Sequence, residues 1–129
     1  MSSKHPKCYV GAALTDAVKA AHLDWKLVEM GYEPSFPWWT RMDSSESSFR
    51  ALAQIMISDV GRSDIVCLLL PGGRGMHVEL GACLESIQQK KVFLIGEPKS
   101  DILFYHHPRC VHVATVTEAV AMIPNLKES

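Results

Sequence analysis

The chain has 129 residues, of which 47% are hydrophobic, and this length predicts a single domain over residues 1–129 with a buried core. Its 13 basic and 14 acidic side chains leave a formal net charge of −1. The near neutrality, without any block of basic residues, argues against a nucleic-acid polymer as partner and favours a small molecule.

Short apolar stretches alternate with helical patterns along the chain. In the first helical pattern Leu14, Val18, Ala21, Leu27 and Met30 fall on roughly one face, which we expect to be buried. The expected strands are 8–12, an extended piece at 32–34, 63–70, 91–96 and 111–113, and the expected helices are 14–31, 49–57, a helix that ends near residue 89, and 117–123.

Strands that alternate with helices predict an α/β fold, a doubly wound, mostly parallel sheet of about five strands between two layers of helices. In such a sheet a ligand binds beyond the carboxyl ends of the strands, where the strand order reverses. The loop after the first strand, with Gly11 and Ala12, should open there, and so should the glycines at 72–75. Tyr9 and Glu79 would then face one crevice.

The most informative run of the chain is PGGRGMHVELG, residues 71–81, which follows an apolar strand and leads into a helical pattern. Glycines let a ligand approach the backbone, and their amides at a helix N-terminus suit an anion such as a phosphate or carboxylate. Arg74 is a natural counter-charge for such an anion, and a solvated loop arginine is an equal alternative. The residues of this run expected to contact the substrate are Gly73, Arg74, Gly75 and Met76.

Glu79 is expected in the first turn of the helix that follows these glycines. The positive end of the helix would keep its carboxylate ionised, which makes it a candidate nucleophile. A glutamate at a helix start is often only a partner for the helix dipole. A surface cap, however, has no need of the three glycines that precede Glu79.

Two adjacent tryptophans, Trp38 and Trp39, follow a proline. Neighbouring residues of an extended segment point to opposite sides, so one ring can enter the core while the other lines a pocket. A tryptophan face stacks readily on a nucleobase, and Trp39 is the expected contact. The alternative is that both rings are core. Asp43, a few residues on, would bind a sugar hydroxyl or a base edge, or cap its loop.

Other polar residues have simpler interpretations. His77 lies two residues before Glu79, so the two do not share a helix face. His106 and His107 have no companion ligands at zinc spacing, and no metal is expected. Turn and surface positions are expected for Asp59 and Arg62, and a position at the start of a strand for Asp64.

The cysteines show no paired CxxC spacing, and most lie in apolar runs, which favours reduced core thiols. The first residues carry no apolar signal-peptide region, and no apolar run is long enough to span a bilayer. We therefore expect a cytoplasmic protein that does not enter a membrane. The four cysteines are Cys8, Cys67, Cys83 and Cys110.

The motif order resembles the nucleoside 2-deoxyribosyltransferase-like superfamily, which includes the transferases, deoxynucleoside 5′-monophosphate N-hydrolases and hydrolases of cytidylate-type nucleotides. The likeness covers nearly the whole chain. It implies a flavodoxin-like or Rossmann-like sheet, no cofactor, and a homodimer or larger oligomer. The residues that carry it are Tyr9-x-Gly11, Ser63-Asp64-Ile65-Val66, Gly73-x-Gly75-x-His77-x-Glu79-Leu80-Gly81 and Lys91-Val92-x-Leu94.

The resemblance assigns Glu79 as the nucleophile and Tyr9 as the tyrosine that orients it. Glu79 would attack the anomeric carbon of a nucleoside or nucleotide, and water or a second base would resolve the covalent glycosyl intermediate. Two aspartates that handle the base in the transferases are replaced here, by Gly73 and, in our alignment, by Met56. These departures favour hydrolysis of a nucleotide, with Arg74 and the glycine amides at its 5′-phosphate.

Three alternatives stay open. The run from Pro71 to Glu79 also resembles the Pro-Gly-Gly-x-Gly-Thr-x-x-Glu motif of cytokinin-activating phosphoribohydrolases, with Met76 in place of the threonine and without their Arg-Lys element. The same crevice would serve a protein that binds a nucleotide or related metabolite without cleaving it. An oligomeric scaffold is the weakest alternative, because it leaves Glu79 and the glycines unexplained.

Overall fold

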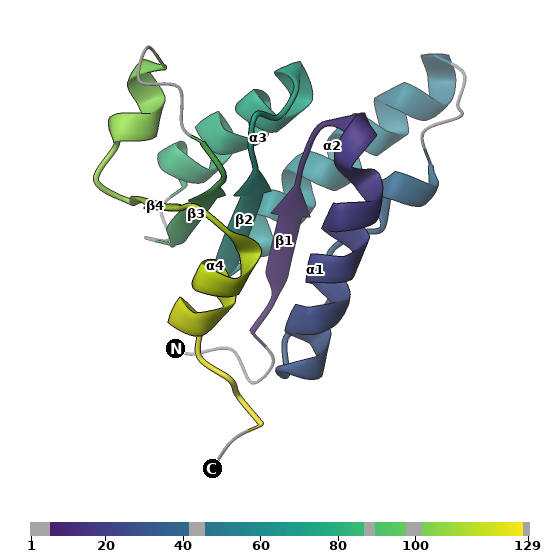
Figure 1. Ribbon diagram of the computed structural model, residues 1–129. Helices are drawn as coiled ribbons and strands as arrows, with labels where there is room; N and C mark the ends of the chain where they lie inside the picture. The colour runs from purple at the N-terminus through teal and green to yellow at the C-terminus, as the bar shows by residue number, and fades with distance from the viewer. Residues whose placement is uncertain (1–5, 42–45, 87–89, 98–101, 128–129) are drawn as a thin grey trace.

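The computed structural model describes residues 6–41, 46–86, 90–97 and 102–127. One parallel sheet with the strand order β1-β2-β3-β4 forms its centre (Figure 1). The strands are β1 (Cys8–Gly11), β2 (Ile65–Leu69), β3 (Lys91–Ile95) and β4 (Cys110–Val113). The helices are α1 (Ala17–Glu29), α2 (Glu46–Arg62), α3 (Arg74–Glu85) and α4 (Val116–Met122), with short 3₁₀ helices at Leu14–Asp16, Trp38–Thr40 and Leu103–His106.

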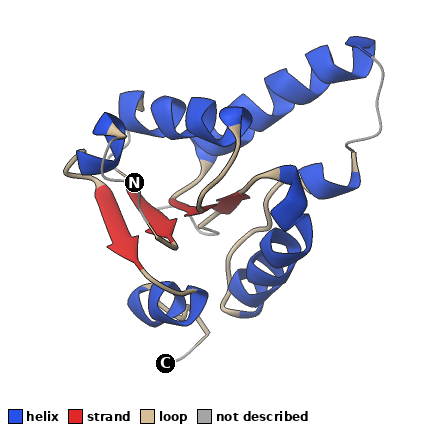
Figure 2. Ribbon diagram, turned by 45° about the horizontal axis from the view of Figure 1, so that its top comes forward, coloured by secondary structure: helices blue, strands red, loops and turns tan. Residues whose placement is uncertain are grey.

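Helices cover both faces of this sheet. Figure 2 shows α2 and α3 together on one side, and α1 and α4 on the other. The predicted α/β class with a parallel sheet is confirmed, and the arrangement is consistent with a Rossmann-like fold. No helix in the described ranges is long and apolar enough to cross a membrane.

The central strands owe their position to continuous apolar runs. In β2 the residues from Val66 to Leu69 are all buried, as expected for a parallel strand covered on both faces.

The expected buried face of the first helix is partly wrong, because Leu14 is 56% and Val18 72% exposed. Residues 14–16 form a 3₁₀ turn, so the α-helical register begins only at Ala17. The residues that α1 buries are Ala20, Leu23, Asp24 and Leu27.

The expected fifth strand is reduced to one bridge, between Lys7 and Glu33, on the side of β1 that faces away from β2. There the Cys8 amide donates to the Glu33 carbonyl at 3.1 Å. Pairing ends because the Ser35 amide donates to Oδ1 of Asp24 at 2.8 Å, and because the Ser35 hydroxyl, not its carbonyl, accepts the Val10 amide at 2.9 Å. The chain still passes from one side of β1, at Glu33, to the other side, at β2, so the carboxyl end of β1 corresponds to the switch points at which parallel sheets bind ligands.

All four cysteines are free thiols. Cys8, Cys67 and Cys83 are buried, as their apolar surroundings predict, whereas Cys110 is half-buried. Burial raises the pKa of the Cys8 and Cys83 thiols to about 12, so these groups stay protonated at neutral pH. They contribute to the core and have no thiolate character.

Candidate active site

Tyr9 of β1 and Glu79 of α3 form a buried hydrogen-bonded pair, in which the Tyr9 hydroxyl donates to Oε2 of Glu79. Tyr9 is fully buried and Glu79 is 5% exposed. The pair forms because β1 and β2 are neighbours in the sheet and α3 follows the turn after β2. The structure thus brings together the two residues that the sequence predicts in one crevice.

Gly11, the last residue of β1, lies directly against the Glu79 carboxylate. A Cβ atom at Gly11 would lie 2.8 Å from Oε1 of Glu79 and 2.7 Å from Cδ2 of Leu68. Only glycine fits this position without moving the carboxylate. Ala12, the next predicted contact, is half-buried at the same strand end.

The expected state of Glu79 is wrong in two respects. The helix begins at Arg74, with Gly73 as its N-cap, so Glu79 lies in the second turn and not in the first. Burial raises the Glu79 pKa to about 7, while the hydrogen bond from Tyr9 lowers it and the charge of Asp59 raises it. Loss of hydration therefore outweighs the hydrogen bond from Tyr9, and both protonation states are populated at neutral pH.

Tyr9 remains a hydrogen-bond donor under all ordinary conditions. Burial, followed by the charge of Glu79, raises the pKa of the Tyr9 hydroxyl far above its usual range. A tyrosine that keeps its proton can only donate to a carboxylate. Tyr9 therefore fixes Oε2 of Glu79 and leaves Oε1 beside Gly11.

The glycine turn next to this pair is open on one side. A Cβ at Gly73 or Gly75 would meet no atom within 4 Å. Arg74 between them is exposed, and in the described structure no side chain caps the start of α3. The first amides of the helix are thus available to an anion.

The Met76 side chain fills the other side of the turn. Gly72 has a φ of +67°, in the left-handed region that favours glycine, and a Cβ there would collide with the Met76 side chain. Met76 is 2% exposed. The side chain of this predicted contact therefore belongs to the core.

His77 does not face Glu79, as the helical spacing predicts. It contacts the backbone at the start of α3 instead. Its Nδ1 lies 2.8 Å from the Gly73 carbonyl, and its Nε2 lies 2.7 Å from the Tyr105 hydroxyl. A carbonyl can only accept, so Nδ1 carries a proton, and Nε2 forms the hydrogen bond with the Tyr105 hydroxyl. His77 therefore links the N-cap of α3 to the buried Tyr105 ring.

The two tryptophans have different environments. Trp38 is 3% exposed, and its Nε1 donates to the Val10 carbonyl at 2.8 Å. Trp39 is half-buried and packs edge-to-face on Trp38, with ring centroids 5.4 Å apart at 72°. One ring, that of Trp38, lies in the core, and Trp39 packs partly buried against it. The predicted contact Asp43 lies outside the described residues.

Asp59 is the polar residue that the sequence places wrongly, since it is neither in a turn nor at the surface. It is 3% exposed on α2 and forms an ion pair with Lys7 at 2.8 Å. A lone aspartate near the end of a helix gives no sequence pattern that distinguishes a buried ion-pair partner from a helix cap.

Arg62 is exposed as predicted. Asp64 accepts the Lys7 amide at 2.8 Å at the start of β2, also as predicted.

Among the residues that the structure describes, no group of three or more His, Cys, Asp or Glu side chains is arranged to hold a metal ion. Comparison with protein-family models and with curated proteins gives no match for this chain. Function is therefore inferred from the residues of the site itself.

Proposed function

We propose that the protein cleaves, or transfers across, the N-glycosidic bond of a nucleoside or nucleoside 5′-monophosphate, with Glu79 as the nucleophile. The observation that carries the proposal is the Glu79 carboxylate, bound by Tyr9, packed against Gly11 and next to an open glycine turn. The resemblance to nucleoside 2-deoxyribosyltransferase-like proteins gives Glu79 and Tyr9 the same roles.

In this scheme Oε1 of ionised Glu79 attacks the anomeric carbon while Tyr9 holds Oε2. The base leaves with the electron pair of the N-glycosidic bond and takes up a proton, and a glycosyl ester of Glu79 forms. Water then attacks the same carbon and releases the sugar, or a second base does so in a transfer. Because only the carboxylate attacks, kcat/KM should rise with pH through about 7, the pKa of Glu79. The scheme uses no cofactor.

A substrate panel tests this proposal. Ribo- and deoxyribonucleosides and their 5′-monophosphates are incubated with the protein, with and without acceptor bases, and free base is followed by chromatography. Release of base identifies the substrate and supports the proposal. An intact panel in the presence of acceptor bases argues against Glu79 as a nucleophile.

A second candidate is a protein of the same fold that binds a nucleotide or related metabolite without cleaving it. The observation that favours it is Met56, which packs partly buried against the core at a position where the transferases have a base-handling aspartate. Gly73 likewise supplies no carboxylate. This candidate predicts that a nucleotide raises the melting temperature while no product forms.

Arg74 should discriminate between phosphorylated and unphosphorylated substrates. We expect Arg74→Gln to raise KM for a 5′-monophosphate about tenfold and to leave KM for the matching nucleoside unchanged, because the exposed guanidinium beside the α3 amides suits a phosphate. Steady-state kinetics on both substrates measure this difference. Lys91→Gln is the control, since Lys91 is exposed at the opposite, amino end of β3. Equal losses for both substrates would contradict a phosphate contact.

We also propose that the chain acts in the cytoplasm as a homodimer or larger oligomer. Large apolar side chains on the neighbouring helices α2 and α3 are exposed, among them Phe49 at 50%, Ile57 at 42% and Val78 at 62%. Light scattering coupled to gel filtration should give at least twice the monomer mass. Ile57→Asp should lower that mass, whereas Val18→Asp on α1 should not. A monomeric wild-type protein would refute the assembly.

A further inference from the structure

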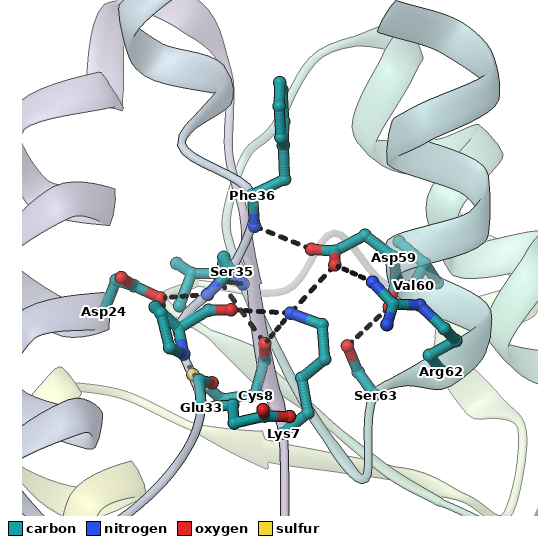
Figure 3. A network of polar contacts seen from close by, with 12 residues as sticks. Lys7, Cys8, Asp24, Glu33, Ser35, Phe36, Asp59, Val60, Arg62 and Ser63 are labelled. Carbon is teal, nitrogen blue, oxygen red and sulfur yellow. Dashed lines mark hydrogen bonds and ion pairs between the residues drawn. The ribbon is translucent and has the colours of Figure 1, made fainter.

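Residues 33–36 run along the outer side of β1 and lead to the two tryptophans, and their backbone is held by buried side chains (Figure 3). The Ser35 amide donates to Oδ1 of Asp24 on α1 at 2.8 Å. The next amide, of Phe36, donates to Oδ2 of Asp59 on α2, also at 2.8 Å. Because α1 and α2 lie on opposite faces of the sheet (Figure 2), consecutive amides are held from two different layers.

Asp59 is itself fixed by a buried cation. Its Oδ1 lies 2.8 Å from Nζ of Lys7, and the two side chains are 4% and 8% exposed. The same ammonium donates to the Pro34 carbonyl at 2.6 Å, so Lys7 contacts both the carboxylate and the segment that the carboxylate holds. Arg62 also reaches Oδ1, at 3.3 Å, but its side chain is 68% exposed. The buried Lys7 contact is therefore the one that fixes the carboxylate.

The held segment continues directly into Trp38 and Trp39. Trp38 is attached to β1 through its indole N–H and the carbonyl of Val10, the residue before Gly11. Trp39 rests on Trp38. The place of the Trp39 ring thus depends on attachments at Ser35, Phe36 and Trp38, of which Asp59 supplies one.

We propose that Asp59, held by Lys7, is a positioning residue that fixes the Ser35–Trp39 segment at the end of β1, so that the Trp39 ring forms the base-binding wall of the site. The identity of the ligand rests on the proposed function. The dependence of Trp39 on Asp59 does not rest on it, and it is measurable without a substrate. Asp59 touches neither the substrate nor the reacting atoms in this account.

Tryptophan fluorescence tests the placement directly. Trp25, the third tryptophan, is 65% exposed on α1 and is replaced by phenylalanine, so that the emission comes from Trp38 and Trp39. Asp59→Asn keeps an oxygen for the Phe36 amide but removes the charge that Lys7 needs, and Asp59→Ala removes both. We expect acrylamide quenching to rise about twofold in Asp59→Ala and less in Asp59→Asn, because the freed segment exposes Trp39.

Kinetics provide the second measurement, on whichever substrate the protein cleaves. Measured at pH 8.5, where Glu79 is ionised with or without the charge of Asp59, Asp59→Ala should raise KM about tenfold and leave kcat within about twofold, because at this pH Asp59 affects ligand binding alone. Arg62→Gln removes the exposed contact to the same oxygen and should leave both quenching and KM unchanged. Thermal melts establish that each variant is folded, and Asp59→Asn decides the question where Asp59→Ala does not fold.

Wild-type quenching in a folded Asp59 variant would overturn the positioning role, and so would a fall in kcat with KM unchanged. If no substrate of the panel is cleaved, the proposed function fails but the fluorescence result still decides the role of Asp59. Raised quenching together with a cleaved substrate and a higher KM supports both.

Discussion

Glu79→Gln is expected to reduce the rate of base release by at least about a thousandfold while the protein stays folded, because an amide cannot act as the nucleophile. Glutamine has nearly the same size, and its carbonyl oxygen still accepts the hydrogen bond that Tyr9 donates to Glu79. Free base measured at saturating substrate gives the comparison. Activity within tenfold of the wild type would exclude a covalent role for Glu79.

The same substitution should raise the free energy of unfolding above neutral pH. The Glu79 pKa is about 7 in the folded protein, against its ordinary value of 4.5. Below pH 4.5 the carboxyl is protonated in both states and has no effect. Between 4.5 and 7 the unfolded chain loses the proton first, so the wild type loses stability as the pH rises. Above pH 7 the full difference amounts to about 3 kcal/mol.

Urea unfolding of the two proteins between pH 4 and pH 8.5 measures this difference. The curves should meet near pH 4.5 and diverge above it, with Glu79→Gln the more stable protein at pH 8. Glu85→Gln on the same helix is the control, because Glu85 is exposed. Parallel curves for Glu79→Gln and the wild type would mean that Glu79 is ionised without penalty in the folded protein.

Gly11→Ala is expected to impair both stability and activity. The new methyl group would lie 2.8 Å from Oε1 of Glu79 and 2.7 Å from the Leu68 side chain, so the carboxylate or β2 has to move. We expect a loss of about 1–3 kcal/mol in stability. The displacement of the nucleophile should lower kcat about a hundredfold. Chemical unfolding and steady-state kinetics measure the two effects.

Gly81→Ala is the matched control for this substitution. Gly81 lies in α3 as Glu79 does, but a Cβ there meets no atom within 4 Å. Alanine is the better helix former, so this variant should gain up to about 1 kcal/mol. An active, stable Gly11→Ala protein would show that the contact between Gly11 and Glu79 does not constrain the site.

The sequence predicts the parts of the site that depend on local sequence patterns. The apolar run of β2, the glycines and the helix after them are contiguous, and parallel topology brings their end of the sheet beside β1. The approach of Tyr9 to Glu79 follows from that topology. The protonation of Glu79 does not, because it depends on how much of the surrounding chain excludes water from the carboxyl.

Long-range polar pairing accounts for the other differences. The ion pair between Asp59 and Lys7 forms only when α2 and β1 have come together in the fold. No residue spacing within either segment predicts it. The fifth strand is reduced to one bridge because the Ser35 amide donates to Asp24 and the Ser35 hydroxyl takes the place of its carbonyl opposite Val10. A strand pattern of three residues does not show which of its backbone N–H and C=O groups will be hydrogen-bonded by side chains from distant parts of the chain.

The way residues 34–36 are bound also closes one side of the sheet to other chains. An outer strand normally offers a row of free amides on which another strand can add, which leads to aggregation. Here Pro34 has no amide, and those of Ser35 and Phe36 are already bonded to Asp24 and Asp59. An approaching strand finds no donor at these three successive positions. The buried carboxylates therefore protect the edge beside β1 against intermolecular β-pairing.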